Sequence, residues 1–210
     1  MINFFFRVVS SLVLAPFFLW VVYINNIFFH LLLLMVFIIS LYELKFVLVK
    51  KKILYIGLFF LILIFLLSVL GVRGYSNNSF YYFLWVILVV WFSDIGGYIF
   101  GNIFKGPVLS KWSPKKTFSG LFGSLILSQF AFLVPSMFAQ GFEYTVVIFI
   151  AQFFLSVVAI LGDLFFSLIK RKHNIKDYSN LIPGHGGLLD RIDGMIFVMV
   201  FAYLIKTYGY

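Results

Sequence analysis

The sequence predicts an all-α protein, a polytopic bundle of about seven transmembrane helices with a cytoplasmic N-terminus. Three observations support this prediction. Hydrophobic residues make up 63% of the 210 positions and only 11% are charged, whereas about 25% of the residues in a soluble domain are charged. The mean hydropathy is +1.10. The basic residues gather in alternate connections between apolar runs, as they do in membrane proteins with positive cytoplasmic loops.

The expected spans are apolar runs separated by polar or glycine-containing breaks, each near the roughly 20 residues that a helix needs to cross a bilayer. They lie at about residues 8–24, 27–44, 53–71, 80–103, 118–138, 144–169 and 187–207. We expect one integral membrane domain over residues 1–210, with N-terminal spans in 1–79 and catalytic spans and cytoplasmic loops in 80–210. The first run lacks a small-residue cleavage site, so we expect it to be retained and not removed as a signal peptide.

The positions of the basic residues set the expected orientation. The connections 45–52, 105–116 and 170–176 carry four basic residues each. Together with Arg7 and Arg191 they account for all of the 16 basic residues except Arg73 and Lys206. This side should be the cytoplasm, which places the C-terminus outside. We therefore expect a protein of the inner, cytoplasmic cell membrane. The net charge of +9 reflects topology, and no nucleic-acid partner is expected.

The acidic residues and the absence of cysteine narrow the choice of metal. With no cysteine in the chain, disulfides and thiolate metal sites are excluded. Five of the seven acidic residues are aspartates, and all five lie from residue 94 onward. Carboxylate oxygens suit a hard cation, so we expect Mg²⁺ and leave room for a second cation.

The first chemical motif lies in the run at 80–103. Asp94, Tyr98 and Gly101 share one helix face because they are spaced i, i+4, i+7. The nearby glycines have a structural explanation, the close packing of helices through small residues. A carboxylate within an apolar span is costly, so we interpret Asp94 as a substrate-binding residue.

The second motif is SPKKTFSG at residues 113–120. Pro114 can begin a helix, and we expect backbone amides and hydroxyl groups there to form an anion site beside two ammonium groups. The candidate phosphate-binding residues are Ser113, Lys115, Lys116 and Thr117. The alternative is that the lysines only set the topology.

The third motif extends from residue 163 to 193. Asp163, Ser167 and Lys170 share one helix face at i, i+4, i+7. Asp190 and Asp193 are one turn apart, and with Asp163 from a neighbouring helix they could chelate one or two cations. The alternative is a structural salt bridge of Asp190 with Arg191 or Lys170.

A glycine-containing turn precedes Asp190. The sequence PGHGG at residues 183–187 allows the backbone to approach a phosphate closely. His185 within it is either a turn residue or a group with a pKa suited to acid–base work, and we do not assign it as the base.

These residues carry a specific resemblance. The pattern S-x-I-K-R-x4-K-D-x-S-x2-I-P-x-H-G-G-L-x-D-R-I-D, residues 167–193, resembles the C-terminal signature of the phosphatidate cytidylyltransferase (CDP-diacylglycerol synthase) family. The segment SPKKT and the D-x-G-x-Y-x-x-G run at 94–101 are similar to that family in the same order. One departure is Ser119, where many members have Glu. The resemblance is firm over roughly residues 90–195.

The resemblance implies an integral membrane nucleotidyltransferase of phospholipid biosynthesis. Its substrates would be CTP and phosphatidate from the inner leaflet, its products CDP-diacylglycerol and pyrophosphate, and its cofactor Mg²⁺. The implied metal ligands are Asp163, Asp190 and Asp193. Residues implied to act on the substrates are Lys170 and Arg171 as catalytic groups, and Asp94, Ser113, Lys115, Lys116, Thr117, Ser167, Lys176, Asp177, His185, Gly186, Gly187 and Arg191 as binding groups. The active site would face the cytoplasm.

Two alternatives stay open at this point. The lipid acceptor could be a polyprenyl phosphate or an archaeal ether-lipid phosphate, because the headgroup chemistry is shared. A cation-coupled transporter also carries intramembrane aspartates and glycine-broken helices. Against transport, the carboxylates lie beside lysine clusters near span ends, and no inverted repeat is evident. The oligomeric state, a homodimer included, is not fixed by the sequence.

Overall fold

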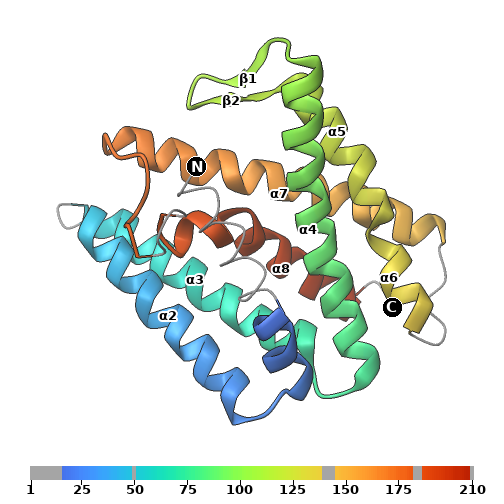
Figure 1. Ribbon diagram of the computed structural model, residues 1–210. Coiled ribbons are helices and arrows are strands. Elements are labelled where there is room, and N and C mark those ends of the chain that lie inside the picture. Colours follow the sequence, from blue (N-terminus) through green and yellow to red (C-terminus); the bar gives the residue numbers. More distant parts are fainter. Residues whose placement is uncertain (1–15, 49–50, 139–144, 182–185, 209–210) are drawn as a thin grey trace.

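The structure is a computed structural model that describes residues 16–48, 51–138, 145–181 and 186–208. It is a helical membrane bundle with one small hairpin (Figure 1). Residues 16–24 are helical. The elements that follow are α2 (Ile27–Leu48), α3 (Lys52–Arg73), α4 (Asn77–Phe104), β1 (Val108–Ser110), β2 (Ser113–Thr117), α5 (Phe118–Ser128), the 3₁₀ helix η1 (Gln129–Phe132), α6 (Leu133–Phe138), α7 (Val146–Lys172) and α8 (Leu189–Tyr208).

Five segments of the described chain are helical, long and apolar enough to cross a membrane. They are Ile27–Lys45, Lys52–Arg73, Asn77–Phe104, Phe118–Phe138 and Val146–Lys172. Five of the predicted spans are thus confirmed as helices of spanning length. The run at 187–207 also forms a helix, α8, but three charged residues lie in its first turns. Of the run at 8–24, residues 16–24 are described and helical, whereas residues 8–15 lie outside the described residues.

Helix α8 occupies the interior of the bundle. It packs against α7, α3 and α4 (Figure 1). Its residues Ile196, Val198, Met199 and Ala202 are fully buried. A helix that is covered by protein on several sides does not need an apolar surface all round, because its polar residues face partners and not lipid. This position allows α8 to begin with Asp190, Arg191 and Asp193.

The glycines of the first motif serve the packing of α4 against α5. A Cβ atom at Gly97 would lie 2.8 Å from Ser124 Oγ, and one at Gly120 would lie 2.8 Å from the Gly97 carbonyl oxygen. Small residues therefore let these two backbones approach closely. The structural explanation considered for the glycines is supported, and it leaves Asp94 on the same helix to be explained by chemistry.

The prediction that Pro114 begins a helix is wrong. Residues 113–117 form strand β2, which pairs antiparallel with β1. Proline is tolerated there because an edge strand of a two-stranded hairpin leaves half of its N–H groups unpaired. Helix α5 begins at Phe118, the first residue of the predicted span, and the Thr117 hydroxyl accepts a hydrogen bond from the Gly120 N–H at 3.1 Å. Thr117 is thus the N-cap.

The predicted helix at 118–138 is divided into α5, η1 and α6. Pro135 lies in the first turn of α6. In a continuous helix its ring would clash with the carbonyl group of residue 131, so the chain changes to a 3₁₀ turn before it.

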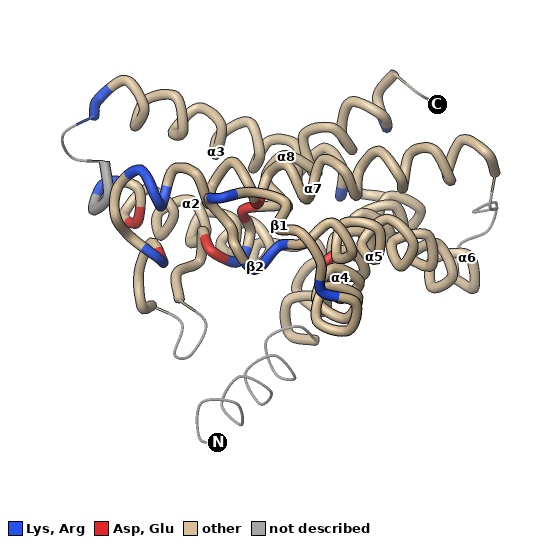
Figure 2. The backbone as a smooth tube through the Cα atoms, turned by 90° about the horizontal axis from the view of Figure 1, so that it is seen from above, with Lys and Arg blue, Asp and Glu red and all other residues tan. Residues whose placement is uncertain are grey.

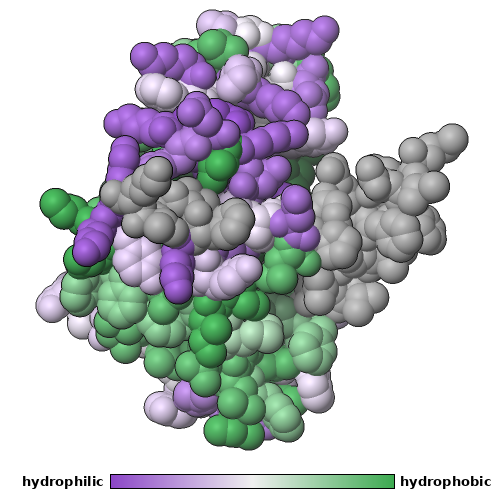
Figure 3. Space-filling view, turned by 90° about the vertical axis from the view of Figure 1, so that its left-hand side faces the viewer, coloured by the Kyte–Doolittle hydropathy of each residue, from purple (hydrophilic) through white to green (hydrophobic). Residues whose placement is uncertain are grey.

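The two ends of the bundle differ in charge. Figure 2 shows the charged positions gathered around the hairpin, the end of α7 and the adjacent ends of α2 and α3, whereas α5 and α6 carry none. In Figure 3 the hydrophilic residues gather in the upper part of one face above a hydrophobic lower part. This division is typical of a protein that meets water on one side and lipid below it.

The two basic residues predicted to lie on the opposite side both close helix C-termini. Arg73 is 3% exposed and donates to the carbonyl oxygens of Val22 at 2.7 Å and Tyr23 at 2.9 Å. Lys206 donates to the carbonyl oxygens of Gly71 and Val72, at 3.0 and 2.8 Å. Cations at helix C-termini satisfy the last carbonyl groups and offset the negative end of the helix dipole.

Candidate active site

A cavity of about 220 Å³ lies between α4, α7 and the β2–α5 junction. Residues from all three sequence motifs line it, among them Asp94, Lys115, Lys116, Thr117 and Asp163. The fold therefore brings together residues that are up to about 70 positions apart in the chain.

The charges in this cavity are paired across helices. Lys116 Nζ forms an ion pair with Asp163 Oδ2. Asp94 interacts electrostatically with both of these groups and with Arg191, at the start of α8. Carboxylates from α4 and α7 are thus balanced by cations from β2 and α8, which reduces the cost of placing them in an apolar surrounding.

A second ionic group lies between α7 and α8. Lys170 is buried and its Nζ lies 2.6 Å from Asp190 Oδ1 and 3.6 Å from Asp193 Oδ2. The Asp193 carboxyl interacts electrostatically with Asp163, which links this group to the cavity. Five charged side chains therefore contact one another in succession, and we call them the ionic network. They are Lys116, Asp163, Asp193, Lys170 and Asp190.

Asp190 also holds the loop between α7 and α8. Its Oδ2 accepts hydrogen bonds from the N–H groups of Tyr178 at 2.8 Å and Gly187 at 3.0 Å. The considered salt bridge between Asp190 and Lys170 is therefore present, and the same carboxylate holds the Gly187 end of the glycine-containing turn. His185 lies outside the described residues.

The two described glycines of this turn, Gly186 and Gly187, are required by geometry. Gly186 has φ of 87°, a conformation that residues with a Cβ atom rarely adopt. A Cβ atom at Gly187 would lie 2.7 Å from Glu43 Oε1. Glycine at both positions therefore lets the backbone lie close to the Glu43 and Asp190 carboxylates. A larger residue at either position would force the backbone away from them.

Glu43 is a site residue that the sequence reasoning missed. It comes from α2 and is 1% exposed. Its carboxylate accepts hydrogen bonds from the N–H groups of Leu188 at 2.9 Å and Leu189 at 2.8 Å, and from Ser179 Oγ at 2.6 Å. An acid at this place caps the start of α8 and complements its dipole. The available signal was its position, because it is the only acidic residue in the first 93 positions and stands in an apolar run.

Tyr178 separates the ionic network from apolar side chains. Its ring lies 5.5 Å from Lys170 Nζ and 6.3 Å from the ring of Phe166. Burial, followed by the nearby Asp190 carboxylate, raises the pKa of the Tyr178 hydroxyl far above its usual range. The hydroxyl therefore stays neutral at physiological pH.

Other predicted site residues lie at the margin. Ser113 pairs with Ser110 in the hairpin and does not line the cavity. Arg171 is exposed and donates to the carbonyl oxygen of Ile175 at 3.1 Å. Lys176 and Asp177 are exposed, and Ser167 is half-buried on α7. Ser119 donates to the Lys105 carbonyl group and contacts Thr117 Oγ1 at 2.9 Å, so its hydroxyl ties the start of α5 to the end of α4.

The described residues contain no group of three or more histidine, aspartate or glutamate side chains placed to hold a metal ion. The predicted set of Asp163, Asp190 and Asp193 is therefore not gathered around one point, because Asp190 is directed to backbone amides and to Lys170. Asp163 and Asp193 do face each other between α7 and α8. This pair offers the oxygen donors that Mg²⁺ prefers.

Comparison with known proteins places the chain in a family. The profile of the family described as "Cytidylyltransferase family" matches residues 45–208. The chain is similar to the phosphatidate cytidylyltransferase of Rickettsia bellii, with 31% identity over 211 residues that cover 97% of this chain and 91% of the relative. It is 41% identical to that of Rickettsia conorii over 135 residues, covering 59% of each chain. It is 33% identical to that of Bacillus subtilis over 135 residues, covering 64% of this chain and 50% of the relative.

The matched region thus spans about three fifths of the length of the Rickettsia conorii relative and half of that of the Bacillus subtilis relative. The profile match, however, extends from the end of α2 to the end of α8 and includes every residue of the ionic network. This chain is a member of the cytidylyltransferase family.

Proposed function

We propose that this protein is a phosphatidate cytidylyltransferase, which forms CDP-diacylglycerol and pyrophosphate from CTP and phosphatidate. The observation that carries the proposal is the cavity in which Lys115, Lys116 and Thr117 face Asp94 and Asp163. The activity named for its relatives, phosphatidate cytidylyltransferase, is in keeping with it.

The reaction joins two polyanions. A phosphate oxygen of phosphatidate attacks the α-phosphorus of CTP, the bond from that phosphorus to the bridging oxygen of the β-phosphate breaks, and pyrophosphate leaves with the electron pair. The attacking oxygen is already an anion at neutral pH, so no side chain needs to remove a proton. The protein must instead reduce the repulsion between the reactants and align them.

Lys115 and Lys116 are suited to the triphosphate. Lys115 is exposed at the cavity, and Lys116 is half-buried against Asp163. A phosphate group entering the cavity competes with Asp163 for the Lys116 ammonium group and adds the charge-assisted hydrogen bonds that phosphates favour. Lys170, held by Asp190 and Asp193, adds a buried positive charge on the α8 side.

Mg²⁺ is proposed as the cofactor, and Asp163 and Asp193 are its proposed ligands in this chain. When bound, Mg²⁺ supplies positive charge to the phosphate oxygens of the transition state and of the leaving pyrophosphate. The resemblance also implies Asp190 as a metal ligand. Its carboxylate could bind the ion only after releasing the N–H groups of Tyr178 and Gly187.

The proposed setting is the inner cell membrane, with the N-terminus and the ionic network at the cytoplasmic side, where CTP is available. Seven spans are proposed, with α8 as the last. Contacts between the helix ends support this arrangement, because Glu43 at the end of α2 meets the start of α8, while Lys206 at the end of α8 meets the end of α3.

Incorporation of radiolabelled CTP tests the function directly. Purified protein should convert labelled CTP and phosphatidate to a lipid-soluble product only when Mg²⁺ is supplied. The other lipid acceptors are tested in the same assay, with a polyprenyl phosphate and an archaeal ether-lipid phosphate in place of phosphatidate. Failure to label phosphatidate under any of these conditions would contradict the proposal.

A further inference from the structure

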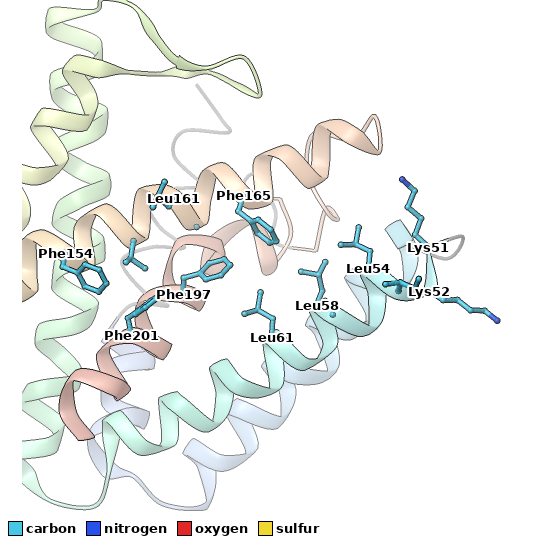
Figure 4. Close-up of a pocket in the computed structure, with 14 residues that line it drawn as sticks. Lys51, Lys52, Leu54, Leu58, Leu61, Phe154, Leu161, Phe165, Phe197 and Phe201 are labelled. Atoms are coloured by element: carbon cyan, nitrogen blue, oxygen red, sulfur yellow. The ribbon is translucent and has the colours of Figure 1, made fainter. Parts of the chain in front are cut away.

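A long apolar groove of about 1650 Å³ runs between α3, α7 and α8 (Figure 4). It lies on the other side of α7 from the cavity that holds Lys116 and Asp94. Side chains from all three helices line it, among them Leu58, Leu61, Leu161, Phe165, Phe197 and Phe201. The two lysines that begin α3, Lys51 and Lys52, stand at one end with their ammonium groups turned outward.

We propose that this groove binds the acyl chains of the lipid substrate. The inference rests on the proposed function and adds to it the place where the apolar part of the acceptor lies. Charge complementarity identifies the occupant, because the groove has apolar walls along its length and two cations at its mouth. An anionic lipid has the same division between acyl chains and a charged headgroup. A peptide would instead need partners for its backbone N–H and C=O groups along an apolar wall.

The groove and the cavity share no lining residue, but both border α7. Gly162 lines the groove, and the next residue, Asp163, lines the cavity. A Cβ atom at Gly162 would lie 3.1 Å from the Asp193 carbonyl oxygen, so the two helices are in close contact where groove and network meet. A lipid in the groove therefore has its chains beside the same helix pair that carries the proposed phosphate and metal groups.

Aromatic rings form the boundary between groove and network. The rings of Phe165 and Phe197, both at the groove, are 5.4 Å apart. Phe197 is followed by Phe166 at 6.3 Å, Phe166 by Tyr178 at 6.3 Å, and the Tyr178 ring by Lys170 Nζ at 5.5 Å. The boundary keeps the acyl chains apart from the charges while leaving them within a few side chains of each other.

Gly57 leaves open space in the wall of the groove. A Cβ atom built at this position meets no heavy atom within 4 Å. Other helix glycines in this fold, such as Gly96 and Gly123, are instead packed against backbone or side chains. The space beside Gly57 is therefore not used for helix packing.

The groove contributes more to the position of the bound lipid than to the free energy of its binding. Acyl chains gain little hydrophobic free energy by moving from a bilayer to an apolar groove, because lipid is as apolar as the side chains. Holding the chains in one direction, however, fixes the headgroup relative to Lys170 and the cavity. The expected signature of a blocked groove is a higher KM for long-chain phosphatidate with an unchanged KM for CTP.

Gly57→Phe tests this signature because a Cβ atom at Gly57 meets no heavy atom within 4 Å and Gly57 lines the groove, so the new ring adds bulk to its wall. The matched control is Ile56→Phe, on the neighbouring residue, which is 52% exposed and does not line the groove. We expect Gly57→Phe to raise the KM for dioleoyl phosphatidate about fivefold or more and the KM for dihexanoyl phosphatidate less than twofold. Gly57→Ala should lie between it and the wild type. An unchanged KM for dioleoyl phosphatidate in an active Gly57→Phe protein overturns the inference.

Direct cross-linking keeps the inference testable if no turnover is found, a result that would overturn only the proposed function. Phosphatidate with a diazirine at the end of one acyl chain, in phosphatidylcholine vesicles, should label Leu58, Leu161 or Phe201. Labelling should be lost in Gly57→Phe and kept in Ile56→Phe. Adducts elsewhere, or equal labelling in both variants, overturn the inference that the groove binds acyl chains. So does a disulfide-linked dimer of the Gly57→Cys protein, since a second copy of the chain would then be the occupant.

Discussion

The carboxylate of Glu43 accepts a hydrogen bond from the N–H group of Leu189 at 2.8 Å, across 146 positions of the sequence. It thereby ties the end of α2 to the start of α8, one residue before Asp190. The Asp190 carboxylate accepts hydrogen bonds from the N–H groups of Tyr178 and Gly187. The two carboxylates together hold backbone groups that follow α7, and we call this pair the frame. The placement of Lys170 and Asp193 therefore depends on an N-terminal span that itself carries no residue of the cavity.

Glu43→Gln is expected to lower both thermal stability and turnover. The amide has only one acceptor oxygen for the three donors and presents an NH₂ group to backbone N–H groups. A buried donor left without a partner costs about 1–3 kcal/mol. Thermal unfolding in detergent and kcat with saturating CTP and phosphatidate measure the two effects.

Tyr42→Phe is the control for this change, because Tyr42 adjoins Glu43 and is 66% exposed. Glu43→Asp keeps the charge and should restore part of the turnover. Wild-type turnover in Glu43→Gln would show that the frame does not position the site.

Lys115→Ala with Lys116→Ala should raise the KM for CTP tenfold or more, about 1.4 kcal/mol of lost binding. Both residues line the cavity, and charge-assisted bonds to phosphate are the stronger kind. Steady-state kinetics with varied CTP measure the change, and the fraction of inserted protein should stay the same.

The hairpin provides the control for these lysines. Lys111 lies over the ring of Trp112 at 4.9 Å and does not line the cavity. Lys111→Ala should therefore leave the KM for CTP unchanged. An equal response of Lys111→Ala and the double variant would favour the alternative in which the lysines only set topology.

Asp190→Asn and Asp193→Asn should each abolish turnover, but only the first should strongly lower stability. Asp190 forms the close pair with buried Lys170 and holds two amides, and breaking a buried pair costs about 3–5 kcal/mol. Asp193 lies farther from Lys170, at 3.6 Å. Parallel measurements of CDP-diacylglycerol formation and thermal unfolding separate the two roles. Turnover near the wild-type rate in a folded Asp193→Asn protein would rule out its proposed part in catalysis.

Single cysteines test the orientation without background, because the chain has no cysteine. Ser113→Cys and Asn174→Cys should react with an impermeant thiol reagent only from the cytoplasmic side, and Asn78→Cys only from outside. The reagent is applied to sealed vesicles of both orientations. Reaction of positions 113 and 174 from opposite sides would mean that the span count between them is wrong.

The sequence predicted local features well and long-range contacts unevenly. Hydropathy located the apolar helices, and helix periodicity grouped Asp163 with Lys170 on α7, where both now join the ionic network. Pro114 was misassigned because proline suits both a helix start and an edge strand, and pairing with β1 decides between them. Glu43 was missed because its partners lie more than 130 residues away, beyond any periodicity.

The positions of Arg73 and Lys206 have a consequence for how the bundle is assembled. In the proposed topology these two are the basic residues that must cross the bilayer during synthesis, against a cost of roughly 2.5–3.5 kcal/mol for each charge at its centre. Each donates to carbonyl groups that precede it in the chain, Arg73 to Val22 and Tyr23, and Lys206 to Gly71 and Val72. Arg73 also donates to the carbonyl oxygens of Gly74 and Ser76, which follow it in the chain. For each of these two cations, carbonyl acceptors from segments synthesised earlier are thus already present when the cation crosses the membrane. The outer ends of the helices can therefore be fastened in the order in which they are made, helix 16–24 to α3 first and α3 to α8 last.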